Sequence, residues 1–147
     1  MQIGDKFEDD LMETFKGPAL TVDAVIEFPD NRVVLIRRGH PPFEGQWALP
    51  GGFVEIGETV DAACRREMKE ECNVDVELRG IIGVYDTLGR DPRGQTVSVV
   101  FRAEAVSGSL EGRDDAIEAR LFTRNEISGL DLAFDHADIL RDAGWLR

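Results

Sequence analysis

An amphipathic helix with acidic residues on its apolar side is the feature that most constrains this chain. The segment "TVDAACRREMKEEC", residues 59–72, has apolar residues at helical spacing, and Thr59 can cap its first turn. At about 100° per residue, the apolar stripe consists of Val60, Ala63, Cys64 and Met68. Three carboxylates interleave with this stripe, and they are Glu67, Glu70 and Glu71. Arg66 falls on the opposite side of the helix.

This placement of the three carboxylates indicates a metal site. Carboxylates crowded beside an apolar face lose hydration and repel one another, and a cation offsets both costs. Spacings of three and four residues put their oxygens on one ridge, and oxygen ligands with retained waters suit Mg²⁺ or Mn²⁺. A solvated charge cluster is the ordinary alternative for "RREMKEE", but it fits poorly with positions among apolar residues.

The residues before this helix complete a plausible reaction centre. Gly51 and Gly52 allow close approach of the backbone to a ligand, and Glu58 ends the loop at the helix start. Arg66 precedes Glu70 by four residues and can orient it. Phosphoanhydride hydrolysis needs metal on the bridging phosphates, a carboxylate that takes a proton from water and an arginine that offsets developing charge. We therefore expect these residues to hydrolyse a phosphoanhydride.

The remaining sequence predicts one domain over residues 1–147 with a mixed sheet and helices on its faces. Residues 20–28 and 32–38 read as a hairpin around "PDN", and residues 39–52 read as a loop. Further strands are expected at 74–87, 95–106 and 118–123, and a helical piece at 135–144.

Composition excludes several classes of protein. The formal net charge of −12 argues against nucleic acid polymers as partners, because their affinity comes mostly from Lys and Arg on phosphates. No apolar run is long enough for a membrane span, and the start lacks a signal-peptide pattern. Cys64 and Cys72 lie too far apart along one helix to form a disulfide, so we expect buried thiols. A cytoplasmic protein without membrane attachment is the expectation.

The spacing of these residues resembles the Nudix box, GX5EX7REUXEEXGU, in which U is a bulky aliphatic residue. The matching stretch begins at Gly52 and Glu58 and continues through "REMKEECNV", residues 66–74. The one departure is Asn73, where the family has glycine, and Asn also tolerates the left-handed conformation that ends helices. The resemblance implies an α/β/α sandwich, a divalent metal and hydrolysis of a nucleoside diphosphate linked to another moiety.

The resemblance also implies roles for individual residues. Glu67 and Glu71 would be metal ligands, with Glu70 close behind and the Gly51 carbonyl contributing. Glu58 would hold the loop or the metal. The general base varies in this family, and it would lie in the box or be a distant acid. Candidates for the distant acid are Asp114, Asp115 and Glu118, each of which is equally readable as a turn or surface residue.

Sequences flanking the box are similar to those of ADP-ribose pyrophosphatases. They are "RRGHPPFEGQWALPGGFVE" and "VYDTLGRDPRGQTVSVVF". Arg37 and Arg38 would then contact phosphate or ribose, and Arg90 and Arg93 would face the terminal ribose or a dimer partner, although this turn needs no functional explanation. Trp47 would stack on a base or pack in the core. The expected reaction is Mg²⁺-dependent hydrolysis of ADP-ribose to AMP and ribose 5-phosphate.

Two other functions remain open. A pyrophosphatase for modified nucleoside triphosphates would use the same box and release pyrophosphate. A non-catalytic ADP-ribose sensor would show a degraded acidic helix or an attached DNA-binding domain, whereas the glutamates here are intact. The first 17 residues, with Phe7, Leu11 and Phe15 at helical spacing, could pack on the same subunit or on a second one, so a homodimer is also an expectation.

Overall fold

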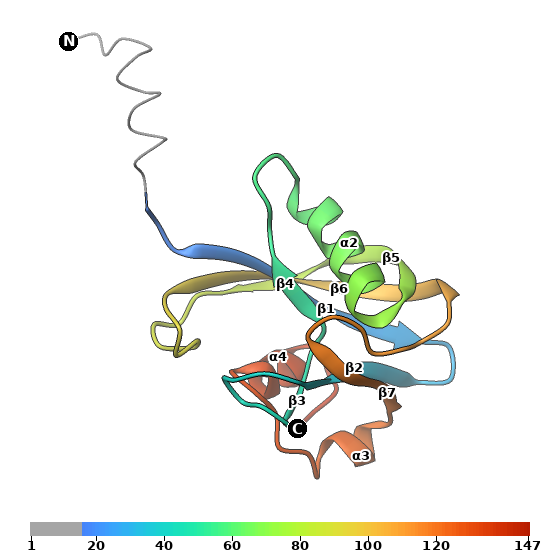
Figure 1. Ribbon diagram of the computed structural model, residues 1–147. Coiled ribbons are helices and arrows are strands. Elements are labelled where there is room, and N and C mark those ends of the chain that lie inside the picture. The colour runs from blue at the N-terminus through green and yellow to red at the C-terminus, as the bar shows by residue number, and fades with distance from the viewer. Residues whose placement is uncertain (1–15) are drawn as a thin grey trace, which may run out of the picture.

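Seven strands form one mixed sheet in the computed structural model, which describes residues 16–147 (Figure 1). The strands are β1 (Ala19–Phe28), β2 (Arg32–Arg38), β3 (Trp47–Ala48), β4 (Gly51–Phe53), β5 (Val74–Tyr85), β6 (Thr96–Gly108) and β7 (Ala116–Phe122). The helices are α2 (Val60–Cys72), α3 (Arg124–Ile127) and α4 (His136–Asp142). The predicted strands and the predicted helical tail are therefore confirmed.

The sheet opens between its first two strands. β1 and β2 pair antiparallel near their connection, at Glu27↔Val33 and Phe28↔Arg32. Beyond this point β1 pairs with β4 through Thr21–Asp23, whereas β2 pairs with β7 and β3. On its other side β1 runs parallel to β6, which makes the sheet mixed. The divergence of β1 and β2 leaves a space that β4 borders.

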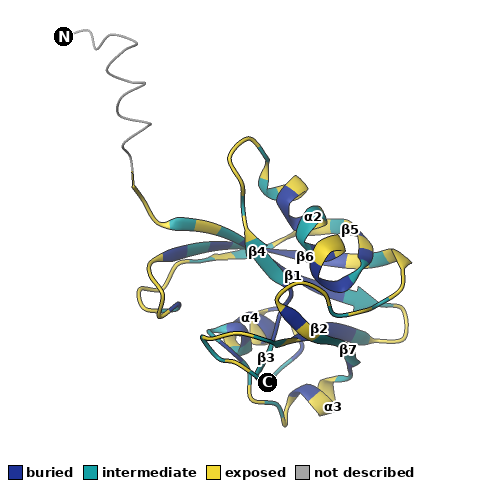
Figure 2. Cartoon of the chain, in the orientation of Figure 1, coloured by how far each residue is buried: buried dark blue, intermediate teal, exposed yellow. Residues whose placement is uncertain are grey.

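Helices cover both faces of the sheet (Figure 1). Side chains alternate along β2, so that Val34 and Ile36 join the core beneath α2, whereas Val33 and Leu35 join the core beneath α3 and α4. Figure 2 colours the buried residues dark blue, and they lie in the strands and on the parts of the helices that face the sheet. This arrangement confirms the predicted α/β/α sandwich.

Helix α2 begins and ends as predicted. The Thr59 hydroxyl accepts a hydrogen bond from the Ala62 N–H at 3.2 Å. Asn73 ends the helix at φ 60° and ψ 35°, in the left-handed conformation that the family's glycine would take, and its N–H donates to the Lys69 and Met68 carbonyls. Cys64 and Cys72 are buried and unpaired on its apolar side, as expected.

Residues 39–52, expected to have loop composition followed by a short apolar piece, contain strand residues at their end. β3 and the first two residues of β4 lie in this range, because the β1 edge and the β2 edge both offer unpaired backbone groups there. The predicted amphipathic segment with Phe7, Leu11 and Phe15 lies outside the described residues. Within residues 16–147, no helix combines the length and the apolar character that a membrane crossing requires.

Candidate active site

Two adjoining cavities lie where β1 and β2 diverge. We call them the acidic cavity, of about 330 Å³, and the basic cavity, of about 70 Å³. Residues of β2, β4 and α2 line both of them, together with Arg93. The shared residues are Ile36, Arg38, Gly51, Gly52, Phe53, Glu71 and Arg93. A ligand that fills both cavities therefore meets Glu67 and Glu70 at one end and Arg38 and Arg93 where the cavities join.

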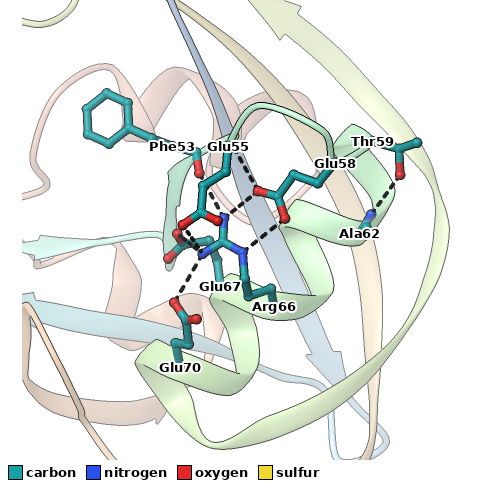
Figure 3. Close-up of polar contacts among 8 residues, drawn as sticks. All are labelled: Phe53, Glu55, Glu58, Thr59, Ala62, Arg66, Glu67 and Glu70. Carbon is teal, nitrogen blue, oxygen red and sulfur yellow. Dashed lines mark hydrogen bonds and ion pairs between the residues drawn. The ribbon is translucent and has the colours of Figure 1, made fainter.

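Arg66 organises the carboxylates of the acidic cavity (Figure 3). Its guanidinium donates to Glu58 at 2.5 and 3.0 Å, to Glu67 at 2.8 Å and to Glu70 at 3.1 Å. It also donates to the Phe53 carbonyl at 3.0 Å. Glu58 in turn accepts the Glu55 N–H at 2.8 Å, which closes the loop before α2. The hydrogen bonds to Arg66 hold the pKa of Glu58 below its ordinary value.

Arg66 was predicted to lie opposite the carboxylates, and this prediction is wrong for its guanidinium group. The long aliphatic stem carries the guanidinium around the helix to the carboxylates, and 23% of the side chain stays exposed. Glu58 raises the pKa of Arg66 further, so that its charge is permanent. Arg66 therefore holds other residues in place, rather than presenting a free charge to a phosphate.

Glu71 is the most buried carboxylate of the acidic cavity, with 7% of the residue exposed. Its Oε1 accepts the Gly51 N–H at 3.1 Å, and no basic side chain of residues 16–147 lies in ion-pair contact with it. Burial raises the pKa of Glu71 to about 8, with smaller contributions from Glu67, Asp23 and Asp115. Burial also raises the pKa of Glu67, against the opposing effect of Arg66.

Two glycines of β4 are required by the carboxylates that press on them. A Cβ atom at Gly52 would overlap the Glu67 carboxylate, and one at Gly51 would overlap the Asp23 carboxylate and the Val22 carbonyl. Gly51 and Gly52 therefore allow close approach by side chains of the protein itself, and their approach to a ligand stays a prediction.

Glu70 departs from the prediction that all three glutamates share the apolar side. It is exposed, with 47% of its side chain accessible, and it lies on the rim of the acidic cavity. Its calculated direction on the helix lies at the edge of the apolar stripe, where the core ends and solvent begins. Glu67 and Glu71 are the two carboxylates that lose most of their hydration.

The oxygen atoms of the acidic cavity suit a hard divalent cation, although they do not surround one common point. Within the described part of the chain, no three Asp, Glu, His or Cys side chains surround a common point. Glu67, Glu70 and Glu71 nevertheless line one cavity with Gly51, and all of them offer oxygen. Glu71 is a buried carboxylate without a positive partner, which is the condition that a cation relieves.

Asp114 and Asp115 reach the acidic cavity from a loop far away in sequence. This loop is attached to the end of α2, because the Glu111 N–H donates to the Cys72 carbonyl at 3.0 Å and the Arg113 N–H to the Glu71 carbonyl at 2.9 Å. Asp114 has a positive φ of 53°. Glu118 does not line the cavity and instead pairs with Arg120 on β7 at 3.0 Å.

The basic cavity combines arginines with aromatic rings. Arg38 lies over the Phe134 ring at 4.9 Å, and Arg93 lies 5.7 Å from the Phe53 ring and 5.8 Å from the Phe134 ring. The Arg38 Nε–H donates to the Pro42 carbonyl at 2.7 Å, and within residues 16–147 its terminal N–H groups have no protein acceptor. These groups are therefore available to an anion.

The other predicted substrate contacts are placed differently. Arg90 lines the basic cavity, but its guanidinium forms two hydrogen bonds with Asp135, at 2.7 and 2.9 Å, and only 6% of its side chain is exposed. Arg37 is exposed, lines neither cavity, and donates to the Gly45 carbonyl. Trp47 also lies outside both cavities, and it packs edge-on against Phe122 at 4.8 Å. The structure thus brings Arg38 and Arg93 to the site, and not Arg37 or Trp47.

Sequence reasoning missed three buried polar residues beside β4. They are Asp23, Ser98 and His136. Asp23 and Ser98 lie in strands that read as apolar, and a polar residue within such a strand was the available signal. His136 and the neighbouring Phe134 belong to the tail, where sequence pattern gave no indication of a site.

Comparison with known proteins identifies related chains. The family model described as NUDIX domain matches residues 17–143. An ADP-ribose pyrophosphatase of Methanocaldococcus jannaschii is 47% identical over 125 residues, which cover 85% of this chain and 72% of that protein. An ADPR responsive transcriptional repressor, NtrR, of Acinetobacter baylyi is 31% identical over 135 residues. That match covers 88% of this chain and about half of the repressor, 54%.

A solved structure shares the fold. It is a bifunctional NMN adenylyltransferase/ADP ribose pyrophosphatase from Francisella tularensis, complexed with AMP and a manganese ion. The TM-score is 0.79 at 26% identity, and the match covers 92% of this chain and 44% of the other.

Proposed function

The chain belongs to the Nudix family, and from that premise we propose that it hydrolyses ADP-ribose to AMP and ribose 5-phosphate. Water adds to one phosphorus of the pyrophosphate, and the bridging P–O bond breaks. The relative from Methanocaldococcus jannaschii, at 47% identity, supports this choice of substrate. The proposal covers Arg38 and Arg93 as substrate contacts and Glu67, Glu70, Glu71 and Gly51 as metal ligands.

The observation that carries the proposal is the junction of the acidic and basic cavities at β4. A pyrophosphate there lies between carboxylates that hold a cation and the open N–H groups of Arg38. Phe53 and Phe134 offer apolar faces to the nucleoside, and Phe53 is 49% exposed. A ligand with two sugars linked by a pyrophosphate matches this order of charge and aromatic surface.

The metal would be Mg²⁺ or Mn²⁺, and when bound it would neutralise the pyrophosphate oxygens and polarise the reacting phosphorus. Glu67 and Glu71 would hold it, with Glu70 and the Gly51 carbonyl as further ligands. Arg66 keeps Glu67 and Glu70 oriented, and Glu58 keeps Arg66 in place. The manganese ion and AMP of the Francisella structure support this choice of cofactor.

The general base is one of three carboxylates at the rim of the acidic cavity. Glu70, Asp114 and Asp115 all line this cavity and are accessible to water. Glu70 is held by Arg66, whereas Asp115 lies 3.5 Å from the exposed His40. The base is the carboxylate whose conversion to the amide lowers kcat most while leaving the Mg²⁺ requirement unchanged.

One experiment tests the reaction. The protein is incubated at fixed Mg²⁺ with ADP-ribose, NADH, diadenosine polyphosphates, nucleoside triphosphates and oxidised nucleoside triphosphates, and the products are resolved by chromatography. We expect AMP and ribose 5-phosphate from ADP-ribose, and ¹⁸O-labelled water identifies which phosphorus is attacked. Chelation of the metal should abolish turnover.

Two outcomes would replace the proposal. Release of pyrophosphate from a triphosphate, with ADP-ribose untouched, would assign the second candidate, a nucleoside triphosphate pyrophosphatase. Tight binding of ADP-ribose without hydrolysis would assign a sensor, the class to which the Acinetobacter repressor's name belongs. The carboxylates on Arg66 and the buried Glu71 favour an enzyme, since a sensor needs no reactive metal site.

A cytoplasmic location and a homodimer are also part of the proposal. The two unpaired, buried cysteines support a reducing compartment. Size-exclusion chromatography with light scattering would measure the number of subunits.

A further inference from the structure

Three buried polar side chains contact one another in series, two of them line the basic cavity, and the reaction proposed above assigns none of them a role. Asp23, Ser98 and His136 are 8%, 0% and 4% exposed, and they come from β1, β6 and α4. Buried polar groups persist only where partners satisfy them. Their partners here are one another and the backbone of the segment that leads into β4.

His136 binds this backbone through one ring nitrogen. The Leu49 N–H donates to its Nδ1 at 2.9 Å, and Leu49 is 2% exposed. Nδ1 therefore carries no proton, and in the neutral ring the proton is on Nε2. Nε2 lies 3.9 Å from the Asp23 Oδ1, so its dipole points a positive end toward that carboxylate.

Asp23 supports the same segment from β1. Its Oδ2 accepts the Ser98 hydroxyl at 2.5 Å, and its Oδ1 occupies the space that a side chain at Gly51 would fill. Asp23 and Gly51 are also paired residues of β1 and β4. Gly51 is thus held by its pairing with β1, and the Asp23 carboxylate fills the space beside it.

Between Leu49 and Gly51 the chain has little freedom. Pro50 has a fixed φ, and its carbonyl accepts the Ala24 N–H at 3.1 Å. A shift at Leu49 is therefore transmitted to Gly51. The Gly51 N–H in turn donates to the Oε1 of Glu71, the most buried carboxylate of the acidic cavity.

We propose that His136, supported by Asp23 and Ser98, is a positioning residue that fixes Leu49–Gly51 and thereby orients the Glu71 carboxylate. The inference rests on the proposed function in one respect, namely that Glu71 serves the reaction. His136 lines the basic cavity with only 4% of the residue exposed, and it acts on Glu71 through two backbone N–H groups, those of Leu49 and Gly51.

Two variants separate positioning from packing. His136→Asn keeps an acceptor near the Nδ1 position but is smaller, whereas His136→Leu fills more volume but has no acceptor. If His136 only packs against Phe134, the Leu variant is the more active one. If the hydrogen bond to Leu49 matters, the Asn variant is the more active one. The two explanations therefore predict opposite orders.

We expect kcat to fall about tenfold to a hundredfold in His136→Leu and about threefold or less in His136→Asn, with KM nearly unchanged in both. The substrate is whichever nucleotide the wild-type protein hydrolyses fastest. Ile139→Ala is the matched control, because Ile139 is fully buried on the same helix and in the same core as Leu49, but its side chain has no hydrogen-bonding group. It should lower thermal stability and leave kcat unchanged.

Amide hydrogen exchange gives a readout that is independent of activity. In the metal-free protein, the Leu49 and Gly51 amides should exchange at least about tenfold faster in His136→Leu than in His136→Asn. The Ile139→Ala variant should show no selective change at these two amides.

Full kcat in His136→Leu, or unchanged Gly51 exchange in that variant, would overturn the inference. A wild-type protein that hydrolyses no nucleotide would instead contradict the proposed function. In that case the exchange of Leu49 and Gly51 still decides whether His136 positions β4.

Discussion

The acidic and basic cavities share β4 but are built in different ways. The acidic cavity takes most of its carboxylates from α2 and the loop before it, and Arg66 binds Glu58, Glu67 and Glu70 within one turn or two of the same helix. The basic cavity takes Arg38 from β2, Arg93 from a turn and Phe134 from the tail. The carboxylates of α2 are thus a local structure, whereas Asp114, Asp115 and the basic cavity are brought to the site by the whole fold.

This difference determines what a substitution changes. On α2, helix geometry keeps the carboxylates in place, so a neutral isostere alters charge and leaves the framework intact. In the basic cavity, the buried pair of Arg90 and Asp135 ties the turn before β6 to the start of α4. Substitutions there should lower the stability of the protein and its affinity for the substrate more than they lower kcat.

The largest effect is expected from Glu71→Gln, which tests the acidic cavity. The amide keeps the shape of the carboxylate and can still accept the Gly51 N–H, but it cannot offer a charge to a cation. We expect kcat to fall about a hundredfold to a thousandfold. Because the raised pKa keeps Glu71 mostly protonated near pH 7 in the metal-free protein, the amide replaces one neutral buried group by another, and the thermal midpoint should not fall. Steady-state kinetics over a range of Mg²⁺ and circular dichroism measure both, and unchanged kinetics would remove Glu71 from the metal site.

Arg90→Ala tests the tie that holds the basic cavity. It leaves Asp135 without its partner, and that side chain is 15% exposed. Loss of one member of a buried pair should cost about 3–5 kcal/mol in the free energy of unfolding. Arg141→Ala is the control, because its pair with Asp138 is exposed and should contribute less than about 1 kcal/mol. Urea unfolding measures both, and equal losses would show that Arg90 does not hold the turn.

Arg38→Lys tests recognition in the basic cavity. Lysine keeps the charge but loses the planar fork, so KM for ADP-ribose should rise about tenfold while kcat changes little. Arg37→Lys is a matched control one residue away, on the face of β2 that lines neither cavity. If both variants show the same KM, Arg38 does not bind the substrate.

The smallest expected effect is a dependence of protein stability on pH, and it comes from His136, which lines the basic cavity. Burial lowers the pKa of His136, against the opposing effects of Asp23 and Asp135. The unfolded chain then takes up a proton near pH 6.5 that the folded chain does not, so this contribution to stability is full above about pH 6.5 and is lost as the pH falls. Between pH 7 and 5.5 the free energy of unfolding of the wild-type protein should fall relative to that of His136→Asn. Parallel curves for the two proteins would show that the imidazole does not titrate on unfolding.

The positions of the long strands along the chain and the position of α2 could be predicted from the sequence, because both depend on local signals. The hairpin around residues 29–31 follows from its turn residues, and α2 follows from its cap and apolar period. β3 and β4 could not be predicted, since strands of two or three residues are decided by the edges that they meet. Arg66 was misplaced because a helical wheel gives a direction and takes no account of how far a side chain reaches, whereas Glu70 lies at the edge of the apolar stripe, where the wheel does not separate core from solvent.

The sequence by itself determined the family, the fold and the acidic cavity. Those features depend on residues at fixed spacing along one helix, and the spacing of a helix is the same in any context. Only the tertiary structure decided that Arg38, rather than Arg37, reaches the site, and that Arg90 is committed to Asp135. It also placed His136 beside Leu49, 87 residues earlier in the chain. Contacts of this kind depend on how β1, β2 and the tail pack, and no local pattern encodes that packing.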